Sequence, residues 1–251
     1  MTVDPEGRAR SLRRTDKVSE AVARDIVQRI SDQSLRPGDK LPAEAAMIAG
    51  YGVGRGTLRE ALRLLESNGM ITIRPGPGGG PQVRAVTAED FGRSAALFFT
   101  ARSLSLDDLI EARSIMEPLA ARLAAVRREP GPDLDHLRRS VELDTAAEDP
   151  AYAEATRDFH TAVIRLCGNG VISLFTESLA TLFHDRVRGV HFPRGRHRQT
   201  VREAHTTVAQ AIIDGAADQA EEAMREHMRT FVAFVKKSHP QLKDEIITWP
   251  R

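Results

Sequence analysis

The 251-residue chain has a single cysteine, no long apolar run and almost no net charge. Because Cys167 stands alone, an intrachain disulfide framework is excluded, and its apolar neighbours indicate a core residue rather than a reactive thiol. No stretch approaches the ~20 apolar residues that a membrane span needs, and the first residues lack the hydrophobic centre of a secretion signal. We therefore expect a cytoplasmic protein with no membrane partner.

The small net charge conceals an uneven distribution along the chain. Residues 1–86 carry 14 lysines and arginines against 10 acids, a net of +4, whereas residues 87–251 carry 22 against 25, a net of −3. A chain of this length can form two domains, each with its own core. A basic N-terminal module on a mildly acidic body is typical of a DNA reader joined to a sensing or assembly domain.

The segment 55–66 has the most informative pattern, because it predicts a helix with two distinct faces. Leucines at the spacing of a buried stripe lie on one face: Leu58, Leu62 and Leu65. Arginines repeat four residues apart on another face: Arg55, Arg59 and Arg63. Cations one turn apart repel each other, so this face makes sense when an anion lies along it. A turn and an apolar helix precede the segment, which suggests a recognition helix that enters a DNA groove.

The elements around this helix predict a winged helix-turn-helix over residues 17–86. We expect helices at Lys17–Ile30, Ala43–Tyr51 and Gly54–Asn68, then strands at Met70–Arg74 and Gln82–Arg84 around a glycine-rich tip. Residues 1–16 are rich in arginine and almost free of apolar side chains, so they are assigned to a flexible basic arm. The arm is either a disordered tail or a segment that touches phosphate.

Two motifs of this module have about a dozen positions at fixed spacing. They read Leu35-x-Pro37-Gly38-Asp39-x-Leu41-Pro42-x-Glu44 and Val53-Gly54-Arg55-x-Thr57-Leu58-Arg59-Glu60-Ala61-Leu62-x-x-Leu65-Glu66-x-x-Gly69. Together they resemble the DNA-binding domain of the GntR family of transcription regulators. The resemblance implies that Arg55 and Arg59 read guanines or hold phosphates. Thr57 lies between them in the first turns of the helix and is assigned to the same reading surface, and Arg63 is either a phosphate contact or makes none.

The same resemblance assigns the wing and shows two departures from the family. Gly76 and Gly78 in the wing tip are expected to approach the minor groove, because glycine lets the backbone come close. Glu60 is expected to pack with the leucines. Gly54 replaces the usual serine or threonine N-cap, and Ala45 replaces a basic residue, so fewer backbone contacts or a different operator are expected.

Residues 87–240 have almost no strand signal and predict one helix after another. The expected helices are Ala88–Ala101, Ser105–Arg128, Pro132–Ala146, Tyr152–Cys167, Val171–Phe192, Arg198–Gly215 and Ala217–Lys236. Short loops join neighbouring helices, so we expect an antiparallel all-α bundle of six to seven helices, followed by a C-terminal tail over residues 241–251. The predicted fold class is mainly α, with a small β-hairpin wing.

Three motifs of the bundle bear on its function. They are Asp108-Leu109-Ile110-Glu111-x-Arg113-x-x-x-Glu117, then Phe159-His160 ahead of Gly168-Asn169, and His205-x5-Ala211-Ile212-x-x-Gly215. They resemble the ligand-binding domain of the FadR subfamily, which is of the FCD type. The resemblance implies that residues 87–240 bind an effector and dimerise.

Three histidines on three predicted helices form the candidate ligand set: His160, His205 and His227. A lone helical histidine is usually a core residue, but the resemblance places all three where relatives bind a divalent metal or an effector. Relatives add an aspartate one turn before the first histidine, where this chain has Thr156. Asp158 lies ~200° around the helix from His160 and should face away. Three imidazoles with an open position could hold zinc or nickel, and without metal they would form a polar effector pocket.

Arg113 is the other pocket candidate. Its simplest role is a salt bridge to Glu117, one turn on, whereas the resemblance points it into the cavity toward the effector. An arginine fork suits a carboxylate or phosphate, so a small organic acid is the expected effector. A basic stretch over residues 184–198 admits a second nucleic-acid site, but a solvated loop edge or a dimer contact is the simpler interpretation.

Together these features predict a homodimeric DNA-binding transcription regulator, taken as a repressor. It would bind an inverted-repeat operator, and a small carboxylate metabolite in the bundle would change the separation of its two winged helices. A metal-responsive regulator, in which the ion at the three histidines is the effector, is the first alternative. A metallohydrolase is the second, because such a site can activate water. No carboxylate general base is evident beside the histidines, so we expect a regulator and not an enzyme.

Overall fold

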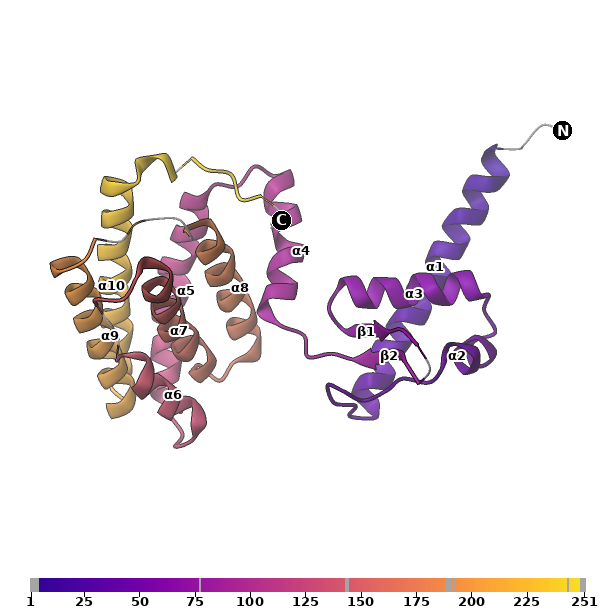
Figure 1. Cartoon of the computed structure of the whole chain (residues 1–251), viewed down its shortest axis with the longest axis horizontal. Helices are drawn as coiled ribbons and strands as arrows, with labels where there is room; N and C mark the ends of the chain where they lie inside the picture. The colour runs from indigo at the N-terminus through magenta and orange to yellow at the C-terminus, as the bar shows by residue number, and fades with distance from the viewer. Residues whose placement is uncertain are drawn as a thin grey trace. The chain divides into compact units, whose positions relative to one another are not determined.

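The structure, a computed structural model, describes residues 5–76, 78–142, 145–187, 191, 193–242 and 244–248, and their side chains from residue 17 onward. It divides into two compact units, Met1–Asp90 and Phe91–Arg251 (Figure 1). The boundary lies slightly beyond the predicted one at residue 86, because residues up to Asp90 pack with the first unit. No helix of the described residues is both long and apolar enough to cross a bilayer.

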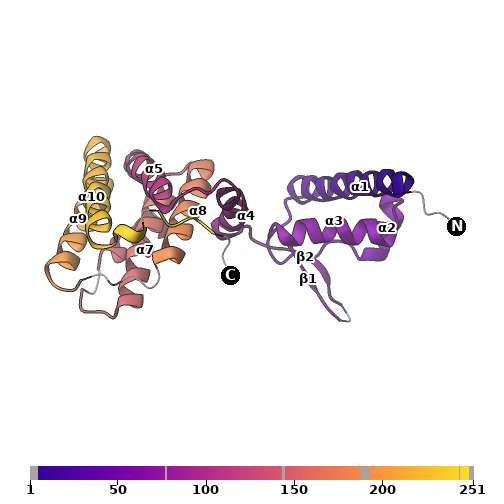
Figure 2. The ribbon, with the colours of Figure 1, turned by 90° about the horizontal axis from the view of Figure 1, so that it is seen from above.

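Within its described residues, the first unit contains three helices and a two-stranded antiparallel sheet, which confirms the predicted winged helix-turn-helix. Its elements are α1 (Pro5–Asp32), α2 (Glu44–Tyr51), α3 (Arg55–Ser67), β1 (Ile71–Arg74) and β2 (Gly80–Val83). The strands pair Ile71 with Val83 and Arg74 with Gly80, so the hairpin turns at the predicted glycine-rich tip. Figure 2 shows α1 and α3 packed together, with the hairpin projecting beside them.

The start of α1 corrects the predicted flexible arm over residues 1–16. The helix begins at Pro5, well before the predicted start at Lys17. Proline suits the first position of a helix and arginine favours helical backbone, so the arginine-rich segment extends α1. Residues 1–4 of the predicted arm lie outside the described residues.

The apolar stripe of α3 forms the centre of the first unit's core. Leu58 and Leu62 are fully buried and Leu65 nearly so, as their spacing predicted. Glu60 does not join them, because it lies ~200° around the helix from Leu58. Its side chain is half exposed and its carboxylate lies 3.9 Å from Arg63. The expectation that Glu60 packs with the leucines is therefore wrong.

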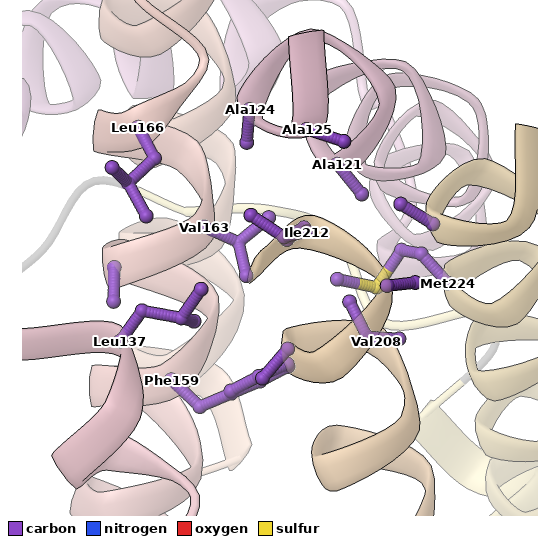
Figure 3. Packing of buried hydrophobic residues seen from close by; sticks show 14 of the residues in the cluster. Ala121, Ala124, Ala125, Leu137, Phe159, Val163, Leu166, Val208, Ile212 and Met224 are labelled. Carbon is purple, nitrogen blue, oxygen red and sulfur yellow. The ribbon is translucent and has the colours of Figure 1, made fainter. Parts of the chain in front are cut away.

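The second unit confirms the predicted bundle, with seven α-helices in the described part of the chain when α4, which begins at the boundary, is included. They are α4 (Ala88–Ala101), α5 (Leu106–Arg127), α6 (Pro132–Ser140), α7 (Asp149–Leu166), α8 (Gly170–Val187), α9 (Arg196–Asp214) and α10 (Ala217–Ser238), followed by the short 3-10 turn η1 (Pro240–Leu242). The central helix is α5, which packs against α7, α8, α9 and α10. Figure 3 shows the core of this unit, where Phe159, Ile212 and Met224 are fully buried.

The C-terminal tail is part of the second unit rather than a separate segment. Leu242 and Ile247 are buried. The backbone N–H of Leu106 donates to the carbonyl of Glu245 at 2.8 Å, and that of Ile247 donates to Leu104 at 2.9 Å. These bonds and apolar contacts hold residues 244–248 against the start of α5, so the predicted limit at residue 241 is not a domain boundary.

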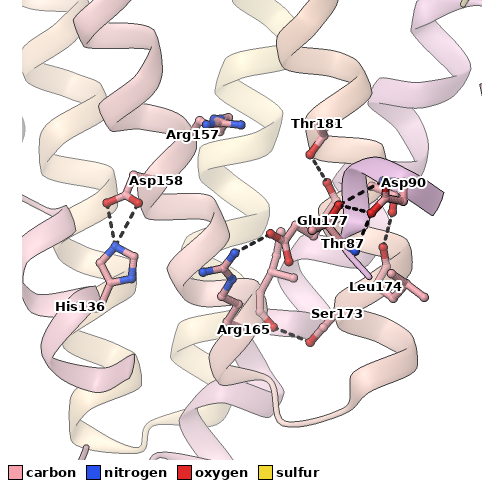
Figure 4. A network of polar contacts seen from close by, with 12 residues as sticks. Thr87, Asp90, His136, Arg157, Asp158, Arg165, Ser173, Leu174, Glu177 and Thr181 are labelled. Atoms are coloured by element: carbon pink, nitrogen blue, oxygen red, sulfur yellow. Dashed lines mark hydrogen bonds and ion pairs between the residues drawn. The ribbon is translucent and has the colours of Figure 1, made fainter. Parts of the chain in front are cut away.

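Asp90 ties the first turn of α4 to the first unit. Its buried carboxylate accepts hydrogen bonds from the backbone N–H and hydroxyl of Thr87, at 3.0 and 2.8 Å (Figure 4). It also accepts from Arg84 at 3.0 Å. It also lies against Gly69, just after α3, where an added Cβ would come within 2.4–2.7 Å of the carboxylate. Gly69 has a φ of +72°, so the turn requires glycine for its backbone and for the space that Asp90 fills.

The substitution Asp90→Ala should lower the free energy of unfolding by about 2–3 kcal/mol. Hydrogen bonds to a charged group contribute ~1.5–3 kcal/mol, and here the substitution removes a buried carboxylate with its bonds to Thr87 and Arg84. Urea unfolding of the full chain measures the loss. Asp135→Ala is the matched control, because its carboxylate is exposed and, within the described residues, forms an ion pair with Arg138 alone, three residues on. Equal losses of unfolding free energy in Asp90→Ala and Asp135→Ala would show that the buried carboxylate of Asp90 does not stabilise the first unit.

Candidate DNA-binding surface and histidine cavity

The arginine face of α3 is exposed, so the first unit presents a cationic surface to solvent. Arg55 is exposed at the first position of the helix, and the side chains of Arg59 and Arg63 are 60% and 74% exposed. Thr57, within the first turn of α3, is partly buried. The structure thus brings the predicted readers onto one helix, and their individual contacts with DNA stay predictions.

Glu44 links the two helices of the helix-turn-helix at Arg59. Its Oε2 lies 3.5 Å from Nε of Arg59, so the start of α2 restrains the position of this fork. The N-cap of α3, Gly54, makes no side-chain hydrogen bond, as its departure from the family pattern led us to expect. The first turn of α3 therefore keeps its N–H groups for other acceptors.

The wing tip depends on glycine and is held by Lys40. Gly76 and Gly78 are exposed, with φ of +94° and +79°. A Cβ on Gly79 would lie 2.3 Å from the carbonyl oxygen of Arg74, so the chain doubles back closely here. Nζ of Lys40 donates to the carbonyl of Gly78 at 2.8 Å. Sequence reasoning missed Lys40, because it stands at an unassigned position of the first motif and reaches the wing only through the fold.

The three histidines converge inside the second unit. His160 on α7, His205 on α9 and His227 on α10 are buried, and Nε2 of His227 lies 3.3 Å from both other Nε2 atoms. One ligand atom from each residue lies within 4.8 Å of the others. Zinc holds nitrogen ligands at ~2.0–2.1 Å in a tetrahedron, which separates two such atoms by about 3.3 Å. The donor set therefore fits a tetrahedral metal ion.

Glu117 on α5 orients the first histidine. One carboxylate oxygen contacts Nδ1 of His160, which leaves Nε2 to face the other imidazoles. The second oxygen accepts from Nε of Arg113 at 2.7 Å. A carboxylate on the outer nitrogen of a ligand histidine is the usual outer partner in metal sites. Burial would raise the pKa of Glu117, but the charge of Arg113 and the hydrogen bond with His160 outweigh it and hold that pKa below its usual range.

Burial keeps the other two histidines neutral. Loss of water, reinforced by the adjacent His160, lowers the pKa of His227 to about 3. Burial and the neighbouring imidazoles also hold the pKa of His205 well below its usual range. The ring of His205 stacks on Phe159 at a centroid distance of 3.8 Å, which fixes its plane. A neutral imidazole has a free lone pair, the form that binds a metal.

Arg113 forms the salt bridge to Glu117 and also lines a cavity beside the histidines. The space open to the centre of a water molecule there is about 50 Å³. The guanidinium carbon lies 4.4 Å from the centre of the Phe183 ring, which holds the fork over the aromatic face. Arg113, His160 and His227 line this cavity, together with Thr156, whereas His205 does not.

The basic stretch over residues 184–198 is not one solvated edge. His184 lines the cavity, and its Nε2 is buried with no hydrogen-bond partner among the described residues. Arg198 is fully buried, lies 4.1 Å over the ring of Tyr152 and donates to the carbonyl of Ala147 at 2.6 Å. The interpretation as a loop edge or dimer contact is therefore wrong for these two residues. Alternating histidine and arginine was their only signal, and it does not distinguish inward from outward side chains.

Two carboxylates near the cluster, Asp158 and Glu117, differ in whether they contact its histidines. Asp158 faces away, as predicted, and its oxygens lie 2.9 and 3.0 Å from Nε2 of His136 (Figure 4). Sequence reasoning identified no carboxylate general base beside the cluster, and it missed Glu117, which contacts His160. Glu117 is bound to the outer nitrogen of His160 and to Arg113, so it is placed to orient a ligand and not to take a proton at the centre of the cluster.

A winged helix-turn-helix with an exposed cationic helix, joined to a helical unit with a ligand-sized cavity, defines a DNA-binding transcription regulator. Comparison with protein-family models gives two matches, "Bacterial regulatory proteins, gntR family" over residues 18–79 and "FCD domain" over residues 108–230. The chain belongs to the GntR family and has an FCD domain. Its relatives are regulators and not enzymes, which removes the metallohydrolase alternative.

Individual relatives cover most of the chain. An Escherichia coli (strain K12) protein named for regulation of the L-lactate dehydrogenase operon is 32% identical over 224 residues, 84% of each chain. The Glc operon transcriptional activator of the same strain is 27% identical over 223 residues, 85% of this chain and 87% of its own. The structure of Streptococcus agalactiae GntR matches with a TM-score of 0.65 at 25% identity, over 85% of this chain and 98% of that one. These similarities confirm the predicted family.

Proposed function

We propose that this regulator is a homodimeric repressor of an inverted-repeat operator, and that a small carboxylate bound in the bundle changes its affinity for DNA. One observation carries the effector site: Arg113 and the buried histidines meet beside one cavity of the FCD unit. The arginine fork suits a carboxylate, and the relative named for an L-lactate operon is consistent with an acid signal. Because its operator is chromosomal DNA, we place the protein in the cytoplasm.

The dimer is proposed from the way winged helices read DNA. One winged helix makes few contacts, so two half-sites supply the affinity and the palindromic specificity. A surface for a second copy lies on α5, where Ile115, Leu119 and Val126 share one face and are 66%, 42% and 61% exposed. Large apolar side chains gathered on one exposed face mark a protein contact.

The charges of α5 fit an antiparallel pair of these helices. Glu111 and Arg122 lie on the face of Ile115, with the acid toward the N-terminal end and the base toward the other. When Ile115 packs near the partner's Leu119, Glu111 comes beside the partner's Arg122. Opposite charges then meet at both ends of the contact, whereas a parallel pair would bring like charges together.

The substitution Ile115→Asp should weaken the dimer at least ~100-fold, because two-fold symmetry buries the unpaired carboxylate twice. Sedimentation equilibrium measures the dissociation constant. Val171→Asp is the matched control, since Val171 of α8 is also 66% exposed and lies off the α5 face. An unchanged dimer, or equal weakening by both substitutions, would place the interface elsewhere.

A divalent metal, zinc or nickel, is proposed as a component of the effector site. His160, His205 and His227 would hold it, and the ion would supply a Lewis-acidic position that water or an effector carboxylate completes. Thr156 lacks the charge of the aspartate expected there, and its hydroxyl donates to the carbonyl of Tyr152 at 3.0 Å. The same convergence of nitrogens supports the alternative of a metal-responsive regulator, in which the ion itself is the signal.

Repression is the simplest result of operator binding. A dimer that covers a promoter excludes polymerase by its bulk and needs no further contact surface. The Glc operon relative is an activator by name, so the direction of control requires a direct test. Transcription in vitro from a promoter that contains the operator should fall when the protein is added, and a rise would contradict repression.

Operator affinity of the full chain distinguishes the acid signal from the metal signal. Duplexes selected from random sequence supply the operator, and fluorescence anisotropy measures binding before and after chelation, and with lactate, glycolate or short-chain fatty acids. A change of about tenfold with an acid, and not with chelation alone, supports the acid effector. A change with chelation, and not with any of the acids, supports the metal-responsive regulator. An affinity insensitive to both treatments would contradict both proposals.

A further inference from the structure

We infer that the effector acid has a short apolar body, so that the cavity prefers a methyl group to a hydroxyl group at the same position. This inference rests on the proposed acid effector and specifies its chemistry. Apolar side chains form much of the cavity wall: Ala153, Phe183, Val187, Val201, Met228 and Phe231. These residues come from α7, α8, α9 and α10, so the apolar wall surrounds the ligand space.

Several polar side chains at the cavity contact other parts of the protein. Thr156 donates to the carbonyl of Tyr152, and the ring of Tyr152 lies under the guanidinium of Arg198. The ring of His197 stacks against Phe234 at a centroid distance of 4.1 Å. The hydroxyl of Thr156 is therefore a poor partner for an additional hydroxyl group on a ligand, and the ring faces of Tyr152 and His197 are covered.

Two groups remain for the carboxylate. The salt bridge of Arg113 uses Nε, which leaves its terminal nitrogens for the cavity. Nε2 of His184 is buried and has no partner in the described part of the chain. A buried polar atom without a partner is costly, and a ligand oxygen would satisfy it. One cation and one imidazole match one carboxylate group.

The volume of the cavity limits the body to a few carbon atoms. A water-sized group needs about 10–15 Å³ of space measured at its centre, so 50 Å³ admits about three to five such groups. A short branched acid fits this space, with its carboxylate at Arg113 and His184 and its methyl groups against Met228 and Phe231.

The expected preference follows from the cost of an unsatisfied hydroxyl. Burying a hydroxyl without a partner weakens binding by about tenfold, and each buried methylene strengthens it about fourfold. Isovalerate and 3-hydroxybutyrate differ only by a methyl or a hydroxyl group at carbon 3, so they isolate this effect. A hydroxyl at carbon 3 is also a weaker metal chelator than one at carbon 2, which limits interference from a bound ion.

Isothermal titration calorimetry of the full chain, before and after treatment with a chelator, tests the inference. We expect isovalerate to bind at least about tenfold more tightly than 3-hydroxybutyrate. Val201→Thr replaces one methyl group of the cavity wall with a hydroxyl group of nearly equal size. It should reduce the ratio of the two dissociation constants, 3-hydroxybutyrate over isovalerate, to less than about threefold. Val171→Thr is the matched control, because Val171 is exposed and does not line the cavity, and it should keep the ratio.

The outcomes separate this inference from the function on which it rests. Equal or tighter binding of 3-hydroxybutyrate overturns the apolar body and keeps the acid effector. A ratio that Val201→Thr and Val171→Thr change equally also overturns it, because the wall would then not set the preference. Binding of neither acid at millimolar concentration contradicts the acid effector itself, and the inference with it.

Discussion

Arg59→Ala should abolish specific operator binding while the chain stays folded and dimeric. Arg59 is exposed on α3, and its only ion pair within the described residues is the long contact with Glu44. A bidentate arginine–guanine contact contributes ~1–3 kcal/mol of discrimination, and a dimer places one such contact in each half-site. The expected loss is therefore about 30-fold to more than 10⁴-fold in affinity. Anisotropy with the selected operator measures it.

A matched arginine on another helix controls for charge alone. Arg24 is exposed on α1, away from the α3 face, so Arg24→Ala removes the same charge and should change affinity little. Thermal unfolding and sedimentation of both variants should match the unsubstituted chain. Unchanged operator affinity of Arg59→Ala would remove Arg59 from the reading surface, and equal losses in both variants would reduce its role to general attraction for phosphate.

Glu117→Ala should cause the largest loss of stability, about 3–5 kcal/mol. The side chains of Arg113 and Glu117 are 3% and 1% exposed, so the substitution leaves a buried guanidinium without its counter-ion. It also removes the partner that fixes Nδ1 of His160, and metal affinity should fall with stability. Urea unfolding and titration with zinc measure the two effects.

An exposed pair of the same unit provides the control. Arg122 and Asp218 form an ion pair in which the Asp218 side chain is 91% exposed, so Asp218→Ala should cost far less. Glu117→Gln retains the shape of the side chain and a hydrogen-bond acceptor. Its loss of unfolding free energy should lie between those of Glu117→Ala and Asp218→Ala. A loss for Glu117→Ala no larger than that for Asp218→Ala would contradict the role of Glu117 as the shared partner of Arg113 and His160.

The DNA-binding unit could be predicted closely because its signals are local. Leucine spacing over residues 58–65, the turn at Gly52 and the strand alternation before the wing are each determined by neighbours in the chain. The same logic failed at Glu60, where membership of a motif was taken for burial. It failed again at residues 5–16, where low apolar content was taken for disorder although arginine and Pro5 favour a helix.

The histidine site could be predicted in its members but not in its outer partners. Three histidines on three helices suggested a cluster, and the fold brings them together. The bond from Glu117 to His160 spans two helices, and the inward direction of His184 depends on how α8 packs. Periodicity places a side chain on a helix face, but the bundle decides which neighbour that face meets.

We propose that acid binding in the FCD unit and operator binding in the winged unit are energetically coupled. Coupling is reciprocal, so the affinity for the acid must change when the operator is bound, by the factor by which the acid changes operator affinity. Calorimetry of the full chain with isovalerate, with and without saturating operator, measures that factor. We predict that the operator weakens acid binding about tenfold or more, as expected of a repressor released by its effector. Equal acid affinity in the presence and absence of the operator would contradict the account.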